Sequence, residues 1–372
     1  MNVLALSLQD PRIPIHGGAR LHLSIAGALA MVGANVVYMA PSTSTEVKLI
    51  YVRTRHGSSQ FTLLKAPFRI NSLASLNIIK NLLKIYKFNL NFILCLDRRL
   101  FLLCKGLSNL LGVPLISLMD APRYMHTKEL LSIGAGPTEA LKTPAGLAFY
   151  HLVVLMSDYT IAPSSYVEEK LQLLAGKITA IEPTFVLLDG KSDILPPTRI
   201  DELPDELVLL SAPLKMSLYL ILKTKANFVV TGPSAYYLRH FLSSRGVGLG
   251  NVYLLHNIND RDLERLHNKV ALAVIARPAL TGISITLLQE LYFHKPILTD
   301  ANTANKLNGL MTSGGVMVNN DYRSWNKNIE ELLDNKALRS RLSRKAEEFF
   351  DLKLRPQLFA TRLLKVLSPA LS

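Results

Sequence analysis

The sequence is poor in cysteine and in acidic residues. Its 372 residues include 2 cysteines and 28 aspartates and glutamates, against 42 lysines and arginines. Both cysteines lie in the apolar stretch 91–107, where we expect buried thiols rather than a disulfide framework or a paired-cysteine metal site. The shortage of acids leaves a formal net charge of +14. This charge favours an acidic partner: nucleic acid, an anionic membrane surface or a phosphorylated substrate.

Long uncharged apolar runs are also missing. No stretch reaches about 18 uncharged apolar residues, and no basic region precedes the first apolar run. We therefore expect a cytoplasmic protein without a signal peptide or a spanning helix, associated at most with the cytoplasmic face of a membrane. Hydrophobic residues make up 49% of the chain, which suffices for sizeable cores, and the length predicts two domains.

Short apolar runs alternate with amphipathic segments in two series along the chain. This alternation predicts parallel sheets with right-handed crossovers. A proline-rich, charged segment separates the series and reads as a linker. The fold class is therefore α/β, with two Rossmann-like doubly wound domains facing across a cleft. We place the domains at residues 1–186 and 207–350, the linker at 187–206 and a basic C-terminal helix at 351–372.

Glycines occur where two predicted strands pass into helices. Gly17 and Gly18 follow the first strand, and Gly282 follows a strand that ends near Arg277. Because glycine lacks a Cβ, a ligand can approach the backbone, and a helix N-terminus offers free N–H groups. A plain turn and a phosphate-binding turn remain equal interpretations of the first pair. For Ser284, helix capping competes with ligand binding.

The order of these segments resembles the GT-B glycosyltransferases of family 4. The stretch 4–41, with its proline-containing loop and two glycines, looks like the start of those enzymes. The stretches 110–120 and 152–171 resemble their central strands, and 248–300 resembles their donor-binding half. The resemblance implies a retaining hexosyltransferase that moves a sugar from a nucleotide-sugar donor to a lipid-linked or polysaccharide acceptor. It also implies an acceptor-binding first domain, a donor-binding second domain and a last helix that crosses back to the first domain.

The family's donor motif, E-G-x-G-x-x-x-x-E, is degenerate here. Thr281 and Gln289 stand where the two acids are expected, around Gly282 and Ser284. Gln289 can still hydrogen-bond a ribose hydroxyl. Glu290 stands one residue late, about 100° around the helix, and is either a further site residue or a solvated one. The family's arginine–lysine pair after the first strand of the donor half is also reduced, and Lys215 is its only remaining cation.

We expect a leaving diphosphate to be stabilised without a metal. Backbone amides of the two glycine turns would supply this stabilisation together with Lys215, and Arg277 is a further candidate; the amides are those of Gly17, Gly18, Gly282, Ile283 and Ser284. No Asp-x-Asp pair occurs in a suitable loop, which argues against a metal-dependent transferase of the other main architecture. No cofactor is expected beyond the nucleotide-sugar substrate. Asp120 resembles the residue that faces the acceptor or sugar, and capping of the following loop is its competing role.

Two other interpretations remain open. The missing acids also suit a non-catalytic GT-B relative that binds a sugar nucleotide as a scaffold subunit. Nucleic-acid binding ranks below both, because no aromatic-rich basic stripe appears. A helix over 77–88 is expected to place Lys80, Lys84 and Lys87 on one face, either solvated or against an anionic bilayer.

Overall fold

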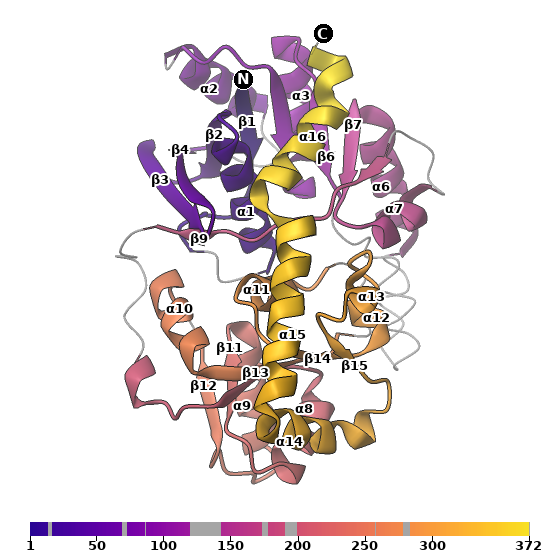
Figure 1. The fold of residues 1–372 in the computed structure, drawn as a ribbon. Coiled ribbons are helices and arrows are strands. Elements are labelled where there is room, and N and C mark those ends of the chain that lie inside the picture. The colour runs from indigo at the N-terminus through magenta and orange to yellow at the C-terminus, as the bar shows by residue number, and fades with distance from the viewer. Residues whose placement is uncertain are drawn as a thin grey trace. The chain divides into compact units, whose positions relative to one another are not determined.

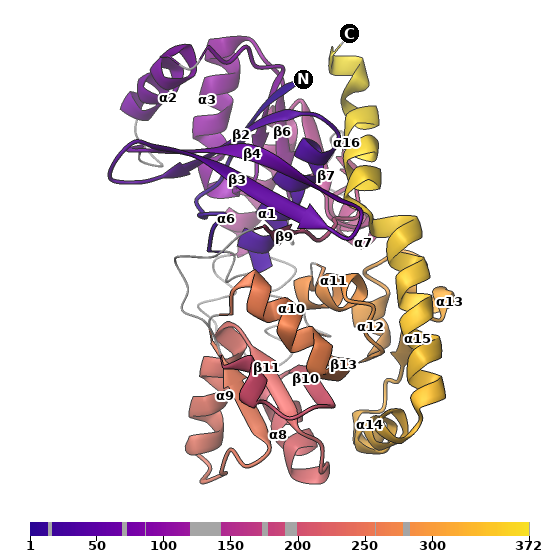
Figure 2. The same ribbon diagram turned by 60° about the vertical axis from the view of Figure 1, so that its left-hand side comes forward.

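The computed structural model describes residues 1–13, 17–68, 73–85, 87–119, 143–172, 178–189, 199–256, 258–277 and 283–371. The chain forms two compact units. The first consists of Met1–Arg12, Leu21–Asp189 and Arg355–Ser372, and the second of Ile13–Arg20 and Gly190–Leu354. Figures 1 and 2 show the elements of each unit. None of the described helices is both long and apolar enough to cross a membrane.

The first unit is built on a nine-stranded sheet with the order β8-β7-β6-β5-β1-β2-β4-β3-β9. Its strands are parallel except for β3, which runs antiparallel to β4 and β9. The strands are β1 (Asn2–Leu6), β2 (Asn35–Pro41), β3 (Glu46–Thr54), β4 (Gly57–Ala66), β5 (Phe92–Cys95), β6 (Leu115–Leu118), β7 (Tyr159–Ala162), β8 (Ile178–Ala180) and β9 (Leu187–Leu188). β1, β5 and β6 are buried on both faces, as expected for parallel strands covered by helices.

Helices cover both faces of this sheet. They are α1 (Gly17–Met31), α2 (Leu73–Ile85), η1 (Arg98–Leu100), α3 (Phe101–Leu111), α6 (Thr143–Met156), α7 (Ser165–Gln172) and α16 (Pro356–Leu371). α1 ends at Met31, and Gly33 follows with a φ of +84°, which suits the left-handed turn after a helix. α2, α3 and α6 share one apolar core, and α2 and α3 lie side by side in both views (Figures 1 and 2). α16 buries Phe359 and Leu363, and its Arg362 lies 3.7 Å from Glu182.

The second unit has a six-stranded parallel sheet with the order β12-β11-β10-β13-β14-β15. The strands are β10 (Leu207–Ser211), β11 (Phe228–Thr231), β12 (Val252–Leu255), β13 (Val270–Ile275), β14 (Ile297–Thr299) and β15 (Met317–Val318). The helices are η2 (Ile200–Glu202), α8 (Leu214–Lys223), α9 (Pro233–Ser243), α10 (Asp260–Lys269), α11 (Ile285–Tyr292), α12 (Ala301–Ala304), α13 (Leu310–Ser313), η3 (Tyr322–Ser324), α14 (Trp325–Asp334), α15 (Lys336–Phe349) and the π-helical η4 (Phe350–Leu354). The fully buried Trp325 lies in the core on one side of the sheet.

The predicted α/β class with parallel sheets is confirmed, but several local predictions need correction. The strand pair β3–β4 and helix α8 were not predicted. The predicted linker begins inside β9, where Leu187 pairs with Arg53 of β3. The lysine face is also shorter than predicted, because α2 ends at Ile85 and Lys87 follows with a φ of +53°.

Each sheet has one place where the strand order reverses. In the first unit the reversal lies between β1 and β5, and in the second between β10 and β13. Crossover helices leave in opposite directions there, and in open parallel sheets ligands generally bind beyond the carboxyl ends of such strands. The residues that end these strands are therefore candidates for a ligand site.

Candidate functional site

Arg277 lies at the strand reversal of the second unit. It follows the end of β13, and the neighbouring strand β10 ends at Ser211. The Arg277 guanidinium donates to Ser211 Oγ from Nε at 3.2 Å and from Nη2 at 2.9 Å. Nη2 also lies 3.4 Å from Oγ of Ser234 in the first turn of α9. The side chain therefore spans the carboxyl ends of three parallel strands, β13, β10 and β11.

Arg277 has no acidic partner within the part of the chain that the structure describes. Its side-chain partners there are the two serine hydroxyls. Burial lowers the pKa of Arg277 below its ordinary value, although the guanidinium remains protonated near neutral pH. A poorly solvated cation held by neutral groups retains its capacity to bind an anion, and the fork of N–H donors suits a phosphate.

The backbone around Arg277 is fixed by a buried polar network. The Arg277 amide donates to Oγ1 of Thr303 at 2.9 Å, and that hydroxyl donates to Asp300 Oδ2 at 2.6 Å. Asp300 also caps α12 by accepting from the Thr303 amide at 2.8 Å. Lys306, itself buried, lies with Nζ 3.4 Å from the Arg277 carbonyl. This network holds the guanidinium in place before any ligand arrives, so little ordering cost remains for binding.

The predicted glycine pair lies in the first turn of α1, within the part of the chain that groups with the second unit. A Cβ built on Gly18 would meet no described atom within 4 Å. The first amides of α1 are free of intrahelical partners, as at any helix start. In the same unit, Arg20 Nη1 donates to Asp260 Oδ2 at 2.6 Å, and both residues are buried. Asp260 begins α10 and is already paired with Arg20. The Asp-x-Asp sequence Asp260–Arg261–Asp262 therefore lies in a helix and not in a metal-binding loop.

The predicted donor loop is described only in part. Thr281 and Gly282 lie outside the described residues, as does Asp120. Ile283 is half-buried, and Ser284 caps α11 by accepting from the Leu287 amide at 3.3 Å. Capping is thus the role that the structure shows for Ser284.

Glu290 is not a solvated helix residue; its side chain is fully buried. Its Oε1 lies 2.8 Å from Nε2 of His267 on α10, and His267 stacks on Phe293 with ring centroids 3.8 Å apart. Gln289, half-buried, donates from Nε2 to the same Oε1 at 3.1 Å. Glu290 stands one residue after the position of the second acid in the family's motif. Its side chain therefore faces the core between α10 and α11, and Glu290 is not a candidate ligand contact.

The contact between His267 and Glu290 is a buried hydrogen bond between two helices. His267 Nδ1 lies 2.7 Å from the Leu263 carbonyl, which only accepts, so Nδ1 carries a hydrogen. The short contact between Nε2 and Oε1 then needs a second hydrogen, on either the imidazole or the carboxyl group. Glu290 Oε2 is buried without a partner in the described part of the chain. The pair therefore joins α10 to α11 and leaves one carboxyl oxygen unsatisfied.

Lys215 is exposed near the beginning of α8. Within the described residues it forms no ion pair, and the structure shows no contact between it and Arg277. No group of three or more His, Cys, Asp or Glu among the described residues is placed to hold a metal ion. Of the predicted donor residues that the structure describes, Arg277 is therefore the one with a built environment for an anion.

The strand reversal of the first unit has a buried polar group of its own. Ser7 follows β1, and its Oγ lies 2.9 Å from Nδ1 of His22 on α1 and accepts from the Gln9 amide at 3.0 Å. His22 also hydrogen-bonds the backbone of Leu96, beyond β5. Burial, opposed by the charge of Asp97, lowers the pKa of His22 to about 4. His22 is therefore neutral near pH 7 and joins the two strands at the reversal.

Sequence reasoning missed Ser7, His22, Ser211 and Ser234 as site residues. A signal for two of them was present, because the apolar runs at 3–7 and 207–211 both end in serine. Their importance depends on which strands flank the reversal, and strand order in a sheet is not visible in the order of segments along the chain. Arg277 appeared only as a further candidate for the same reason.

Known proteins with similar structures clarify the architecture. The sequence matches no protein-family model and no curated protein. Among solved structures, sucrose-phosphate synthase from Thermosynechococcus elongatus is similar with a TM-score of 0.72 and 12% identity, over 99% of this chain and 98% of that one. HepE from Anabaena in complex with UDP-glucose gives 0.64 and 13%, over 99% and 100%. A trehalose-6-phosphate synthase studied for glycosyl transfer with retention gives 0.59 and 10%, over 99% of both chains.

These three proteins are glycosyltransferases of the GT-B architecture, and each is matched along nearly its whole length. At 10–13% identity the likeness concerns the fold. The chain has the GT-B fold, as the sequence resemblance predicted.

Proposed function

We propose that the chain is a glycosyltransferase that uses a nucleotide-sugar donor. The observation that carries the proposal is Arg277, a poorly solvated guanidinium that the described structure pairs only with serine hydroxyls at the strand reversal of a parallel sheet. A diphosphate supplies the missing negative charge. Structural neighbours support this choice of ligand, since HepE was solved with UDP-glucose.

The chemistry assigned to the site is stabilisation of a leaving diphosphate. Negative charge gathers on the β-phosphate as the bond to the sugar breaks, and preorganised donors stabilise that charge most when water is excluded. Arg277 supplies a forked cation, Ser234 lies in the first turn of α9, and the free amides of Gly17 and Gly18 begin α1. These groups act without a metal ion in this proposal, so chelators should leave activity unchanged.

Binding of uridine diphosphate tests the site directly. We expect isothermal titration calorimetry to detect binding of UDP or GDP to the wild-type protein. Arg277→Gln should weaken it by about 10- to 100-fold, the range for a hydrogen bond to a charged group. Lys223→Gln, which removes an exposed cation at the other end of α8, is the matched control and should bind normally. Thermal melting without ligand establishes that each variant is folded.

Three outcomes of the nucleotide titration distinguish a donor site at Arg277 from the alternatives. If neither UDP, GDP nor their sugars bind the folded wild-type protein, the donor assignment is wrong. Equal losses in Arg277→Gln and Lys223→Gln would indicate a general charge effect rather than a built site. A selective loss in Arg277→Gln supports the assignment.

The finer proposals are a hexosyltransferase, retention at the anomeric carbon, and a lipid-linked or polysaccharide acceptor. The trehalose-6-phosphate synthase neighbour supports retention. Proton NMR of the product distinguishes retention from inversion by the coupling of the anomeric hydrogen. The same assay, repeated with EDTA, tests the metal-free mechanism. If turnover appears only in a Thr281→Glu/Gln289→Glu variant, the wild-type chain is a sugar-nucleotide-binding relative and not an enzyme.

We further propose that the first unit contacts an anionic membrane that carries the acceptor. Lys80 and Lys84 lie on α2, the latter exposed, and the neighbouring helices leave large apolar side chains in solvent. The most exposed of these are Leu102 on α3 and Leu155 on α6, at 63% and 65%. Lysines beside exposed leucines suit an interfacial surface.

A further inference from the structure

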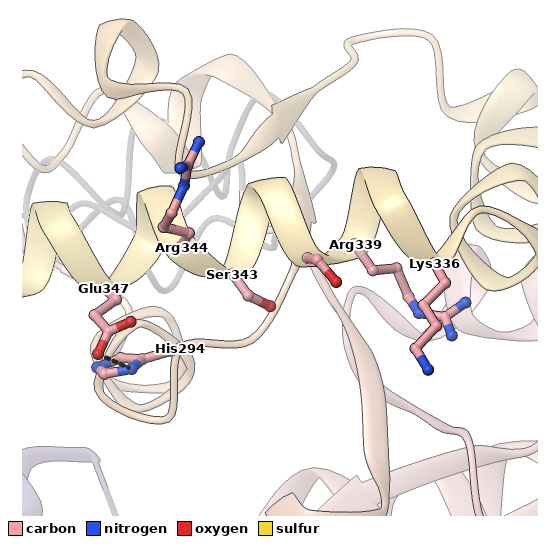
Figure 3. Close-up of a pocket in the computed structure, with 7 residues that line it drawn as sticks. His294, Lys336, Arg339, Ser343, Arg344 and Glu347 are labelled. Atoms are coloured by element: carbon pink, nitrogen blue, oxygen red, sulfur yellow. Dashed lines mark ion pairs between the residues drawn. The ribbon is translucent and has the colours of Figure 1, made fainter.

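A shallow, open cavity of about 410 Å³ lies on the surface of the second unit, and each residue that lines it is polar or charged. The residues that line it are Lys336, Arg339, Ser340, Ser343, Arg344 and Glu347 of α15, together with His294. Figure 3 shows that Lys336, Arg339, Ser343 and Glu347 project from one side of α15, whereas Arg344 points to the other side. Basic and hydroxyl groups along one helix face indicate a site for an anion.

Arg339 is held in an orientation that suits anion binding. Its Nη1 donates to the Leu332 carbonyl at 2.9 Å and to the Leu333 carbonyl, which lie at the end of α14. Its Nη2 donates to Oε1 of Glu206 at 3.0 Å. The carbonyls fix the guanidinium, whose side chain is 15% exposed, while the Glu206 side chain is 65% exposed. Exposed ion pairs contribute little to stability, so an external anion can replace the Glu206 carboxylate.

Two residues beside this cavity have an unusual backbone. Glu206 and His294 have φ values of +58° and +53°, and Lys87 is the one other non-glycine residue with positive φ in the described part of the chain. Both residues pair with α15 at the cavity: Glu206 with Arg339, and His294 with Glu347 at 3.3 Å. For His294 this conformation ends α11, because its amide donates to the Leu291 carbonyl at 3.1 Å and the Lys295 amide donates to the Glu290 carbonyl at 2.9 Å.

Three further donors of the cavity have no partner among the described residues. Lys336, exposed at the beginning of α15, forms no hydrogen bond or ion pair within the described residues. The same holds for the hydroxyls of Ser340 and Ser343 in that part of the chain. The cavity thus combines an oriented guanidinium, an unpaired ammonium and two hydroxyl donors, with one displaceable carboxylate in place.

We propose that this cavity binds the phosphate group of a small phosphorylated molecule. The dianion takes the place of the Glu206 carboxylate on Arg339, Lys336 supplies the second charge, and the two serines donate to phosphate oxygens or to hydroxyls of the attached molecule. A guanidinium fork and a lysine point charge together match a phosphate dianion better than a monovalent carboxylate. The site is separate from Arg277 and does not depend on the proposed transferase activity.

Inorganic phosphate is the probe, titrated by calorimetry at constant ionic strength with chloride as the balancing anion. The titration uses the full-length chain in an Arg277→Gln background, which removes the other candidate phosphate site. Lys336→Gln should weaken phosphate binding about tenfold, because it removes a charge-assisted contact. Glu206→Gln should strengthen it about two- to fivefold, because the competing carboxylate is gone. Lys327→Gln, an equal charge change on the exposed surface of α14, should leave binding unchanged.

Lys336→Gln and Glu206→Gln both change exposed side chains and should shift phosphate affinity in opposite directions. Because a loss of folded protein cannot produce opposite shifts, the test does not depend on folding. Glucose 6-phosphate should bind more tightly than phosphate if the attached molecule also contacts the cavity, and glucose alone should not bind. The proposal is overturned if phosphate does not bind, or if Lys336→Gln and Lys327→Gln give the same affinity. It is likewise overturned if Glu206→Gln weakens binding.

Discussion

His22 makes stability depend on pH at the scale of a single residue. Its pKa is about 4 in the folded chain, because burial disfavours the imidazolium, against an ordinary value of 6.5. Between these values the unfolded chain binds a proton that the folded chain does not. Stability therefore falls as the pH decreases from about 6.5 towards 4, by roughly 3 kcal/mol for this residue.

A His22→Asn variant should lose that dependence. Asparagine keeps polar atoms near Ser7 and Leu96 but does not titrate. We expect urea unfolding at pH 7, 6 and 5 to show a smaller fall in the free energy of unfolding for the variant than for the wild type. The pKa of Asp97 is lowered, so its protonation removes a stabilising contribution only at more acidic pH, below the pH range of these measurements. Parallel curves for the two proteins would contradict the assignment of His22 as a buried neutral group.

Glu290 provides a second test at this scale. Its carboxyl group is fully buried against His267, so Glu290→Ala should destabilise the chain by about 3 kcal/mol by leaving His267 without its partner. Nucleotide affinity of the folded fraction should not change, because the side chain faces the core. Unfolding experiments measure the first effect and calorimetry the second. If Glu290→Ala were stable but failed to bind nucleotide, Glu290 would be a residue of the ligand site after all.

Individual site residues were predictable only to the extent that local sequence determines them. Helix capping was one of two roles predicted for Ser284 from its position before an amphipathic segment, and the structure shows this cap. The burial of Glu290 was not predicted, because it depends on how α10 packs on α11. The environment of Arg277 was missed because its partners, Ser211 and Ser234, are more than 40 residues away in the sequence.

At the scale of elements, Gly315 is a point of close packing in the second unit. A Cβ at this position would lie 3.1 Å from the Ala346 amide nitrogen and the Lys345 carbonyl oxygen of α15. Backbone atoms cannot move aside without shifting the helix. Gly315→Ala should therefore destabilise the chain by about 1–3 kcal/mol, as measured by chemical unfolding.

Gly106 is the matched control for this prediction. A Cβ there would lie 3.1 Å from the Leu76 side chain, a flexible neighbour that can adjust. Gly106 is inside α3, where alanine gains about 1 kcal/mol of helix propensity. Gly106→Ala should therefore change the free energy of unfolding by less than about 1 kcal/mol. If both variants were equally stable, the backbone contact at Gly315 would not be a tight one.

Most strands and helices were predictable because their apolar residues recur with a clear period or form short buried runs between turn residues. The missed strand β3 shows where this signal fails. Its Leu49 and Tyr51 are 51% and 50% exposed, while Ile50 and Val52 between and beyond them are buried. Apolar residues on both faces hide the alternation that identifies a strand. Helix α8 follows Pro213 without a side-chain cap, so its sequence lacks the usual signal for the start of a helix.

At the scale of the whole molecule, a net charge of +14 favours attraction to any anionic membrane. A specific docking face therefore depends on where the positive side chains lie and not on their number. α2, α3 and α6 share one core, and their outer sides carry both lysine and exposed apolar residues. The apolar residues are Ile85, Leu102, Leu110, Leu152, Leu155 and Met156. We expect the full chain to sediment with vesicles that contain phosphatidylglycerol, weakly with pure phosphatidylcholine, and less at 0.5 M salt because screening weakens the lysine contribution.

Paired variants distinguish a docking face from general charge. Each lysine near an anionic surface contributes about 1 kcal/mol, so Lys80→Gln/Lys84→Gln should weaken vesicle binding by roughly 30-fold. Lys223→Gln/Lys225→Gln makes the same charge change on exposed residues of the second unit and should have little effect. Leu155→Gln should also weaken binding while leaving its salt dependence intact, because it removes insertion and not charge. Equal losses in the two lysine pairs would show that the membrane responds to net charge, and that α2 has no special place in docking.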